Sequence, residues 1–360
     1  MLKRIVRRAV RLALRSARIR ALVESELKPW RASAKARTTP EPTGPVGRFV
    51  DRHGVEHELQ PGLRDKLKPS WRVMCDPVAV AAPPTDDALQ GRAKKADKSA
   101  EEARSLVQLV AGRPLTGRIL EVGCFDGSVA FALARDSGTT VIGSDLARYY
   151  VIQRPAEPTA AEVEAQQTTL AELRERARII AGIEAGRVEF VEDDITVSSL
   201  DPGSFDAIVS FEVLEHVQRP AEAFAAMARL LRPGGVVYHD YNPFFSSIGG
   251  HSLCTLDVPW GHVRLDAGDF ERYLREIRPT EVDQGLRFYT ENLNRMTLAE
   301  MRAGIVSAGL ELLEVVPWYE RALVPGVTPD VLAEVQRTYP GATTEDLLAT
   351  FVAVVARRPA

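Results

Sequence analysis

The sequence has few cysteines and lacks a long apolar run. Only three of its 360 residues are cysteines, Cys75, Cys124 and Cys254, and no two of them form a C-x-x-C pair. Neither a disulfide framework nor a cysteine zinc site is therefore expected, which is typical of a reducing compartment. No apolar stretch approaches the roughly 18 residues that a membrane-spanning helix needs. We therefore expect a protein without a transmembrane helix.

An extreme composition is also absent. Hydrophobic residues make up 45% and charged residues 26% of the chain, which excludes bulk disorder, collagen and disulfide scaffolds. The net charge of −3 combines a basic amino-terminal end with an acidic remainder. Because an acidic body lacks the basic footprint of a general nucleic-acid binder, nucleic acid is not expected as a partner. The length fits two to three units of about 150 residues, or one enlarged α/β domain with appendages.

Basic residues gather in the first 27 positions, which hold eight lysines and arginines against Glu24 and Glu26. Apolar and basic side chains follow helical spacing there, so residues 1–37 are predicted to be a basic amphipathic helical tail. Such a helix can lie on an anionic membrane surface, and we expect a cytoplasmic protein with a peripheral contact to the inner membrane through residues 1–20. The alternatives are a helix that docks on the body of the protein or on a partner, and a mitochondrial transit peptide, since no acid precedes Glu24.

Residues 38–97 are predicted to be a linker and a small amino-terminal extension. The stretch TTPEPTGPVG cannot hold a helix and is typical of a linker. The next stretch, FVDRHGVEHELQ, is expected to form a short hairpin around His53 and Gly54. Trp71 and His57 are interpreted as packing residues, because no group of catalytic or ligand-binding residue types surrounds them.

The main domain is predicted to cover residues 98–360. Its first helix is expected to begin at a capping box, Ser99 and Glu102, and to end near Gly112. Five apolar strands then alternate with helices: RILEVGC, TVIGSD, RVEFVEDD, FDAIVSFEV and VVYHDYN, with AEAFAAMARLLRPGG as a helix that its glycines end. This alternation favours an α/β fold with a parallel, doubly wound, Rossmann-like sheet, whose ligand lies at the carboxyl ends of the strands.

The first of these strands ends in a glycine-containing turn, EVGCFDG. A dinucleotide fingerprint would need G-x-G-x-x-G, but Phe125 and Ser128 occupy the second and third glycine positions, which speaks against a dehydrogenase. Gly123 and Gly127 still allow the backbone to pass close to a ligand. Asp145 ends the second strand, where a carboxylate can accept from both hydroxyls of a ribose. A nucleoside-containing ligand is therefore predicted.

Five motifs in order, EVGCFDG, SD at Asp145, EDD, FDAIVSFEVLEHV and LLRPGG, resemble those of the class I S-adenosyl-L-methionine (SAM)-dependent methyltransferases. The resemblance implies SAM as the cofactor and a seven-stranded sheet that a carboxyl-terminal antiparallel hairpin completes. It implies that Asp145 holds the ribose and that Asp194 with Ile195 frames the adenine. The whole implied cofactor site consists of Glu121, Gly123, Cys124, Asp126, Gly127, Asp145, Asp194, Ile195, Phe211 and Glu212.

One position departs from the family pattern. Phe125 stands where the family usually has a glycine. For this reason we keep a non-catalytic SAM-binding protein as an alternative to an active methyltransferase.

Three insertions interrupt the family pattern, at residues 146–185, 241–296 and 320–346. Insertions after strand ends usually build the acceptor pocket. The stretch 239–265, which starts at the end of the fifth strand and runs into the second insertion, is dense in polar and aromatic residues and holds three histidines. We therefore predict an acceptor with a hydroxyl on a carbohydrate, a glycosylated molecule or another small molecule. His262, His251 and His216 are the candidate bases for that hydroxyl.

A divalent metal is the other predicted route to an activated hydroxyl. Glu212, Glu215 and His216 are spaced i, i+3 and i+4, which puts them on one face of a helix. With His262 they could bind Mg²⁺ or Mn²⁺. The E-x-x-E-H pattern resembles the metal site of small-RNA 3′-terminal 2′-O-methyltransferases and is similar to ubiquinone-pathway O-methyltransferases, so RNA 2′-O-methylation is an alternative function. In the metal-free alternative, the histidine is structural or acts as a plain base.

Overall fold

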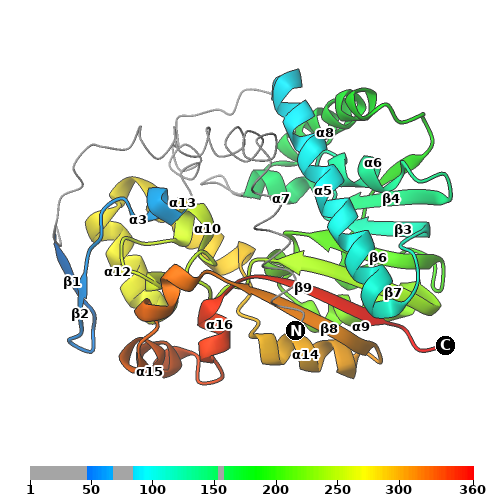
Figure 1. Ribbon diagram of the computed structural model, residues 1–360. Coiled ribbons are helices and arrows are strands. Elements are labelled where there is room, and N and C mark those ends of the chain that lie inside the picture. The colour runs from blue at the N-terminus through cyan, green and yellow to red at the C-terminus, as the bar shows by residue number, and fades with distance from the viewer. Residues whose placement is uncertain (1–46, 68–83, 153–157) are drawn as a thin grey trace, which may run out of the picture. The chain divides into compact units, whose positions relative to one another are not determined.

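The computed structural model describes residues 47–67, 84–152 and 158–360 (Figure 1). The amphipathic tail, most of the linker, Trp71 and Cys75 lie outside the described residues. None of the described helices is both long and apolar enough to cross a bilayer.

A seven-stranded sheet of order β5-β4-β3-β6-β7-β9-β8 forms the centre of the described residues. The pairs among β3 to β7 are parallel, whereas β9 runs antiparallel to both β7 and β8. This confirms the predicted doubly wound sheet with a carboxyl-terminal antiparallel hairpin. Its strands are β3 (Gly117–Val122), β4 (Thr139–Asp145), β5 (Val188–Glu192), β6 (Phe205–Phe211), β7 (Leu231–Tyr241), β8 (Glu311–Tyr319) and β9 (Ala349–Arg357).

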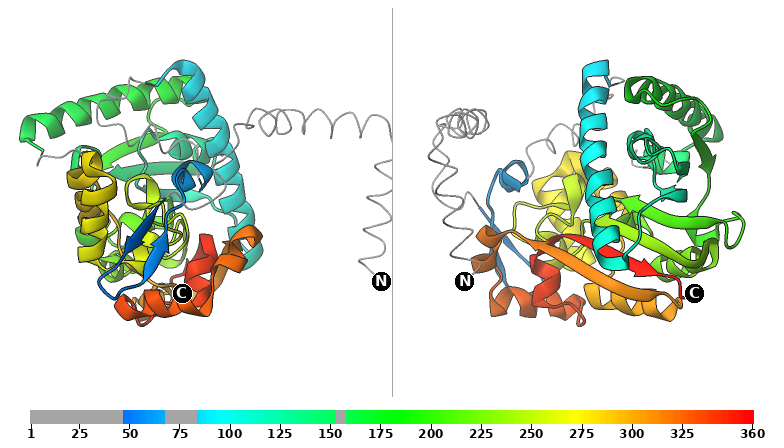
Figure 2. Two further views of the ribbon diagram at one scale, coloured as in Figure 1. Left: turned by 90° about the vertical axis from the view of Figure 1, so that its left-hand side faces the viewer. Right: turned by 45° about the vertical axis from the view of Figure 1, so that its right-hand side comes forward.

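Helices cover both faces of the sheet, as Figures 1 and 2 show. On one face, α5 (Asp86–Ala111) and α6 (Ser128–Leu133) enclose a core with the side chains of the central strands. On the other face, α9 (Pro220–Leu230) and α14 (Leu298–Ser307) enclose a second core. Both faces of a parallel sheet are apolar and need such cover, so the carboxyl edge of the strands is left as the place for a ligand.

The first helix begins earlier than we predicted from the capping box at Ser99. It begins at Asp86, and the hydroxyl of Thr85 accepts a hydrogen bond from the amide of Ala88. Residues 86–98 contain several good helix formers, including alanines and lysines, so the helix continues upstream and leaves Ser99 in its interior. The predicted end is confirmed, because Gly112 caps the helix in a left-handed conformation.

The predicted glycine stop of α9 is also wrong. The helix ends at Leu230, and the next residue, Leu231, already pairs with Phe205 of β6. Gly234, with a φ of 75°, lies within the long strand β7. Pairing with the neighbouring strand therefore ends this helix before the glycines are reached.

A further core lies beside the carboxyl edge of the sheet. The predicted hairpin is confirmed as β1 (Arg48–Val50) and β2 (Glu56–Glu58), and its Phe49 and Leu59 pack against residues of the second and third insertions. His57 is buried and bonds Asp51 at 3.1 Å, as a packing residue would. Figure 1 shows the hairpin next to the insertion helices.

The remaining elements are short, apart from one long helix in the first insertion. They are α3 (Leu63–Leu67), α7 (Ala147–Ile152), α8 (Ala160–Ala181), η1 (Ile195–Val197), η2 (Leu214–His216), α10 (His251–Cys254), α11 (Gly261–Arg264), α12 (Ala267–Ile277), η3 (Pro279–Glu281), α13 (Val282–Arg287), η4 (Phe288–Asn292), η5 (Arg321–Gly326), α15 (Pro329–Thr338) and α16 (Thr344–Leu348).

The start of α5 can be tested by replacing two hydroxyl residues, Thr85 at the observed amino-terminal cap and Ser99 at the predicted one. Thr85→Ala removes the amino-terminal cap and is expected to lower the free energy of unfolding by about 1 kcal/mol. Ser99→Ala, in the helix interior, is expected to be neutral or slightly stabilising. Urea denaturation of both variants measures the difference, and a larger loss for Ser99→Ala would contradict the observed helix start.

Candidate active site

A cavity of about 920 Å³ lies at the carboxyl ends of the central strands. This is near the upper end of the range for small-molecule sites, so it has room for a cofactor together with a second molecule. Every residue of the predicted cofactor site except Gly127 lines it: Glu121, Gly123, Cys124, Asp126, Asp145, Asp194, Ile195, Phe211 and Glu212. The roles that the resemblance gives these residues toward SAM stay predictions.

The turn after β3 keeps a tight, left-handed path. Gly123 has a φ of 74°, and a Cβ there would come within 2.3 Å of Val213. Phe125 is also left-handed, with a φ of 43°. Its amide donates to Asp145 Oδ2 at 2.5 Å, and its carbonyl accepts from Arg174 Nε at 2.8 Å. These two contacts hold a conformation that a non-glycine residue rarely adopts.

The side chain of Phe125 is accommodated as well. The guanidinium of Arg92 lies 5.4 Å from the centre of its ring, and Arg92 also pairs with Asp126 at 2.9 Å. Arg92 comes from α5, so this helix is tied to the turn by both contacts. With phenylalanine in place of glycine, the turn gains side-chain contacts with Arg92, while the backbone keeps a left-handed path.

Glu121 is a buried carboxyl group in the cavity wall. It is 3% exposed, and its Oε2 has no hydrogen-bond partner among the described residues. Burial raises its pKa well above the ordinary value, and the nearby Asp126 and Asp145 act in the same direction. An unsatisfied buried carboxyl oxygen is costly, so this position suits a ligand that brings a hydrogen-bond donor or a positive charge.

The wall of the cavity is acidic. Ten aspartate and glutamate side chains line it, against four arginine and lysine side chains. Asp240, at the end of β7, is buried, and burial together with the nearby Glu212 raises its pKa to about 7. Like charges repel one another at low effective dielectric, so this cavity favours a cationic ligand over a polyanionic one.

Glu212 does not join the group of possible metal ligands found among the described residues. Its side chain is 47% exposed and faces Lys95 at 3.7 Å. Its backbone is left-handed, with a φ of 55°, so the chain turns sharply between Glu212 and Glu215. The i, i+3, i+4 spacing places residues on one face only in a continuous helix, and the short η2 begins after Glu212, at Leu214.

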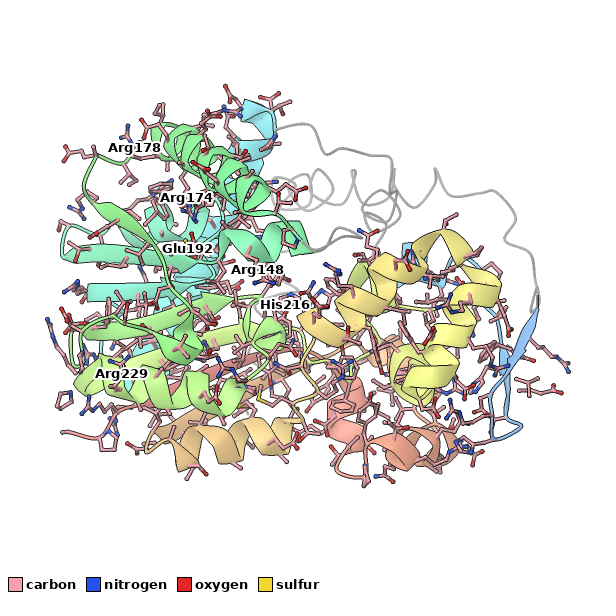
Figure 3. The ribbon with its side chains drawn as sticks, turned by 180° about the vertical axis from the view of Figure 1, so that it is seen from behind. Arg148, Arg174, Arg178, Glu192, His216 and Arg229 are labelled. Carbon is pink, nitrogen blue, oxygen red and sulfur yellow. The ribbon has the colours of Figure 1, made fainter. Side chains whose placement is uncertain are left out.

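Glu215 and His216 are brought together with His251. One donor atom from each lies within 4.8 Å of the others. Glu215 accepts from the Asn242 amide at 3.2 Å, its Oε2 has no partner among the described residues, and burial raises its pKa to about 8. His216 lines the cavity, and burial lowers its pKa to about 4. Figure 3 shows His216 between the sheet and the insertion helices, and Arg148 lines the same cavity.

The proton on the His216 ring can be placed from its neighbour. The Nδ1 atom lies 2.7 Å from the carbonyl oxygen of Asn292. A carbonyl only accepts, so Nδ1 carries the proton and donates it. In the neutral ring, Nε2 is then the basic position.

His262 does not belong to this group, contrary to our prediction that it is a metal ligand and a base. It is 1% exposed, its Nε2 bonds the carbonyl of Phe244 at 2.8 Å, and its ring packs edge-on against Phe244. It is absent from the cavity wall. Its hydrogen bond and packing leave the ring no access to a ligand there. His251 is the third member of the group with Glu215 and His216, although it too is absent from the cavity wall.

Sequence reasoning missed the contribution of α5 to the cavity. Arg92, Lys95, Ser99 and Glu102 all line the wall. They recur every three or four residues, which is the spacing of one helix face. That spacing was visible in the sequence, but assigning the helix start to Ser99 hid it. Asn292 was missed because an irregular insertion gives no periodic signal.

A methyltransferase-domain profile matches residues 94–315, more than half of the chain. The chain belongs to the class I SAM-dependent methyltransferases. This confirms the family that the five motifs predicted. The observed sheet has the seven strands and the carboxyl-terminal antiparallel hairpin that the resemblance implied.

Two relatives of this methyltransferase are named ubiquinone biosynthesis O-methyltransferase. The protein of Paracidovorax citrulli is 32% identical over 182 residues, which are 48% of this chain and 63% of that protein. The protein of Ralstonia nicotianae is 29% identical over 173 residues, 47% of this chain and 60% of that protein. The match thus spans less than two thirds of the length of either relative.

Solved structures with a similar fold include two methyltransferases. One is the SAM-dependent methyltransferase from Mesorhizobium loti, with a TM-score of 0.40 and 18% identity over 72% of this chain and 100% of that one. The other is geranyl diphosphate methyltransferase, with a TM-score of 0.40 and 16% identity over 73% of this chain and 85% of that one.

The turn at Phe125 can be tested by two substitutions. Phe125→Gly suits a left-handed backbone, so it is expected to retain affinity for S-adenosylhomocysteine and to change stability by less than about 1 kcal/mol. Phe125→Val places a β-branched side chain there and is expected to lower stability by about 1–3 kcal/mol. Calorimetric titration measures the affinity of each variant for S-adenosylhomocysteine, and thermal unfolding measures its stability. Equal tolerance of valine and glycine would contradict a left-handed turn.

The acidic wall leads to a pH prediction. Asp240 is neutral below its pKa of about 7 and charged above it, so raising the pH from about 6 to about 8 should favour the SAM sulfonium over neutral S-adenosylhomocysteine. A unit charge several ångströms away contributes roughly 1–2 kcal/mol, so the ratio of the two dissociation constants should change up to about tenfold. Asp240→Asn should flatten this dependence, and an unchanged slope in that variant would show that Asp240 is not its source.

Proposed function

We propose that this methyltransferase transfers a methyl group from SAM to a hydroxyl of a small molecule, with His216 as the base. The single observation that carries the proposal is the orientation of the His216 ring. Its Nδ1 is held by the Asn292 carbonyl, so the basic Nε2 is left on a side chain that lines the cavity. A hydroxyl is a poor nucleophile until it loses its proton to such a base.

The two ends of the cavity would have different roles, cofactor binding at one and activation of the hydroxyl at the other. At one end, Glu121, Asp145 and the turn at Phe125 would bind and orient the cofactor. When bound, SAM supplies an electrophilic methyl group, whose carbon–sulfur bond breaks as the bond to oxygen forms. At the other end, His216 would hold the hydroxyl and take its proton on Nε2. Much of the catalysis is then the alignment of the hydroxyl oxygen with the methyl group.

The weak basicity of His216 favours an acceptor oxygen that is easily ionised. Burial lowers the pKa of His216 to about 4, and a weak base deprotonates a phenol, with a pKa near 10 in tyrosine, more readily than a sugar hydroxyl. The Tyr149 ring lies 5.4 Å from that of His216 and lines the same cavity, which suits a planar acceptor. The names of the curated relatives support oxygen as the nucleophile.

Asn292 supports a small oxygen-containing acceptor independently. Its side chain is 2% exposed and lines the cavity, and its Nδ2 has no hydrogen-bond partner among the described residues. A buried amide without a partner is costly, so it is well suited to bind an oxygen of the acceptor. A second oxygen beside the reacting hydroxyl would satisfy it.

The acidic wall speaks against the RNA alternative. An RNA 3′ end would bring phosphates into a cavity with ten acidic and four basic side chains, whereas RNA-binding surfaces are normally basic. The non-catalytic alternative rested on the absence of a glycine at position 125. Because Phe125 has a left-handed backbone all the same, that absence no longer supports it. A carbohydrate hydroxyl stays a prediction, and it would need stronger activation than a weak base provides.

A divalent ion is the second candidate, favoured by the group Glu215, His216 and His251. The unpartnered Oε2 of Glu215 fits this group, and His216 would donate its other ring N–H to a carbonyl, as metal-binding histidines usually do. Two nitrogens and one carboxylate suit Mn²⁺ better than Mg²⁺. When bound there, the ion would lower the pKa of the acceptor hydroxyl, so that a sugar hydroxyl could also be activated.

The base can be tested by a transfer assay with methyl-labelled SAM. The acceptors would be catechol, a neutral methyl glycoside and an RNA oligonucleotide with a free 3′ end. His216→Gln is expected to lower turnover by about 10²- to 10⁴-fold while affinity for S-adenosylhomocysteine stays within twofold. His53→Ala, at an exposed histidine of the hairpin, is the matched control and should be fully active. Full turnover in His216→Gln would refute the role of the base.

The metal is tested by chelation. If an ion carries the chemistry, EDTA should abolish turnover and Mn²⁺ should restore it. Calorimetry should then show one Mn²⁺ bound to the parent and none to Glu215→Gln. Undiminished activity in chelator would leave His216 as a plain base.

A further inference from the structure

The turn that carries Glu215 and His216 has little support of its own. It is a single turn of 3-10 helix, η2, and no side chain caps its amino-terminal end. Its internal hydrogen bonds are His216 to Val213 at 2.8 Å and Val217 to Leu214 at 3.3 Å. So short an element cannot fix a side chain to the accuracy that catalysis needs, and its orientation must come from outside.

Asn294 supplies that support. Its Nδ2 donates to the carbonyl of Leu214 at 2.7 Å and to that of Val217 at 2.9 Å, so one amide spans both ends of the turn. Its backbone amide donates to the carbonyl of Glu215 at 2.9 Å. Its Oδ1 accepts from the amide of Met296 at 3.1 Å, which fixes the orientation of the side chain. The residue is 7% exposed, so water does not readily replace these bonds.

The same stretch of chain also contacts the cavity. Asn292, two residues before Asn294, holds Nδ1 of His216 through its carbonyl, and it lines the cavity together with Glu291. Both belong to η4, a π-helical turn at the end of the second insertion. Such turns are frequent at functional sites. The segment 291–294 therefore touches the acceptor end of the cavity on one side and the η2 turn on the other.

We propose that Asn294 is a positioning residue, which holds the η2 turn so that His216 Nε2 faces the acceptor. The inference rests on the proposed role of His216. Asn294 itself lies outside the cavity wall and acts through the turn. We call the hydrogen bonds from Asn294 to the η2 turn the clamp. The clamp belongs to the insertion that also lines the acceptor end, so this insertion both shapes the acceptor site and aligns the base.

The test uses Asn294→Asp and Asn294→Ala. Asn294→Asp keeps the shape of the side chain and the bond from Met296, but it loses the N–H donors and turns an oxygen toward two carbonyls. Asn294→Ala removes the side chain. A displacement of about 1 Å can cost about 10²-fold in rate, so both variants are expected to lower kcat for catechol by about 10- to 100-fold per S-adenosylhomocysteine-binding site. KM and the affinity for S-adenosylhomocysteine should change less than threefold.

A spectroscopic signature separates positioning from general loss of structure. The ¹⁵N shifts of the His216 ring report its tautomer. The parent protein should show a single Nδ1–H tautomer, and the Asn294 variants should show a mixture. Thr297→Ala is the matched control, because it removes the cap of α14 three residues away and leaves the turn intact. It should lower stability without changing kcat or the ¹⁵N shifts.

Unchanged kcat and an unchanged single tautomer in folded Asn294→Asp and Asn294→Ala would overturn the proposal. The ring signals need no turnover, so the clamp can be judged even if the proposed function fails. A parent that shows the Nδ1–H tautomer but methylates no acceptor would contradict the function of His216. A tautomer that the Asn294 variants alter in that protein would still support the clamp.

Discussion

The hydrogen bond from the Phe125 amide to the Asp145 carboxylate joins the ends of the two strands that begin the sheet. The predicted cofactor end of the cavity depends on it, because the turn after β3 must stay left-handed to keep its backbone close to a ligand. Arg174 holds the carbonyl of the same residue. A glycine would adopt this conformation with less strain, so in this chain the neighbouring contacts perform what a glycine does by itself.

The proposed acceptor end is built differently. There the sheet contributes one short turn, η2, and the insertion 241–296 contributes the groups that orient it. The insertion packs with the β1–β2 hairpin and the α15 region around a core separate from the two sheet cores. In the proposed function, the protein thus combines a cofactor end on the sheet with an acceptor end that rests on its own hydrophobic core. Such a division allows the acceptor to change while the sheet stays the same.

The strands were predictable because each is an apolar run with a polar or glycine-containing end. The gathering of the predicted cofactor residues around one cavity was predictable for a related reason: parallel strands bring their carboxyl ends to one edge, so Asp145 had to lie near the turn at Gly123. The start of α5 was not predictable, because S-x-x-E also occurs inside a helix when the residues before it are good helix formers. His251 could not be distinguished from His262 either. Their positions depend on packing within an irregular insertion, and spacing in the sequence does not fix such distances.

The most direct test of the account is a structure with S-adenosylhomocysteine and catechol bound. The reacting hydroxyl oxygen should lie within about 2.6–3.2 Å of His216 Nε2, with Nδ1 still on the carbonyl of Asn292. A catechol oxygen that bonds another group, with the His216 ring turned away from it, would contradict the account.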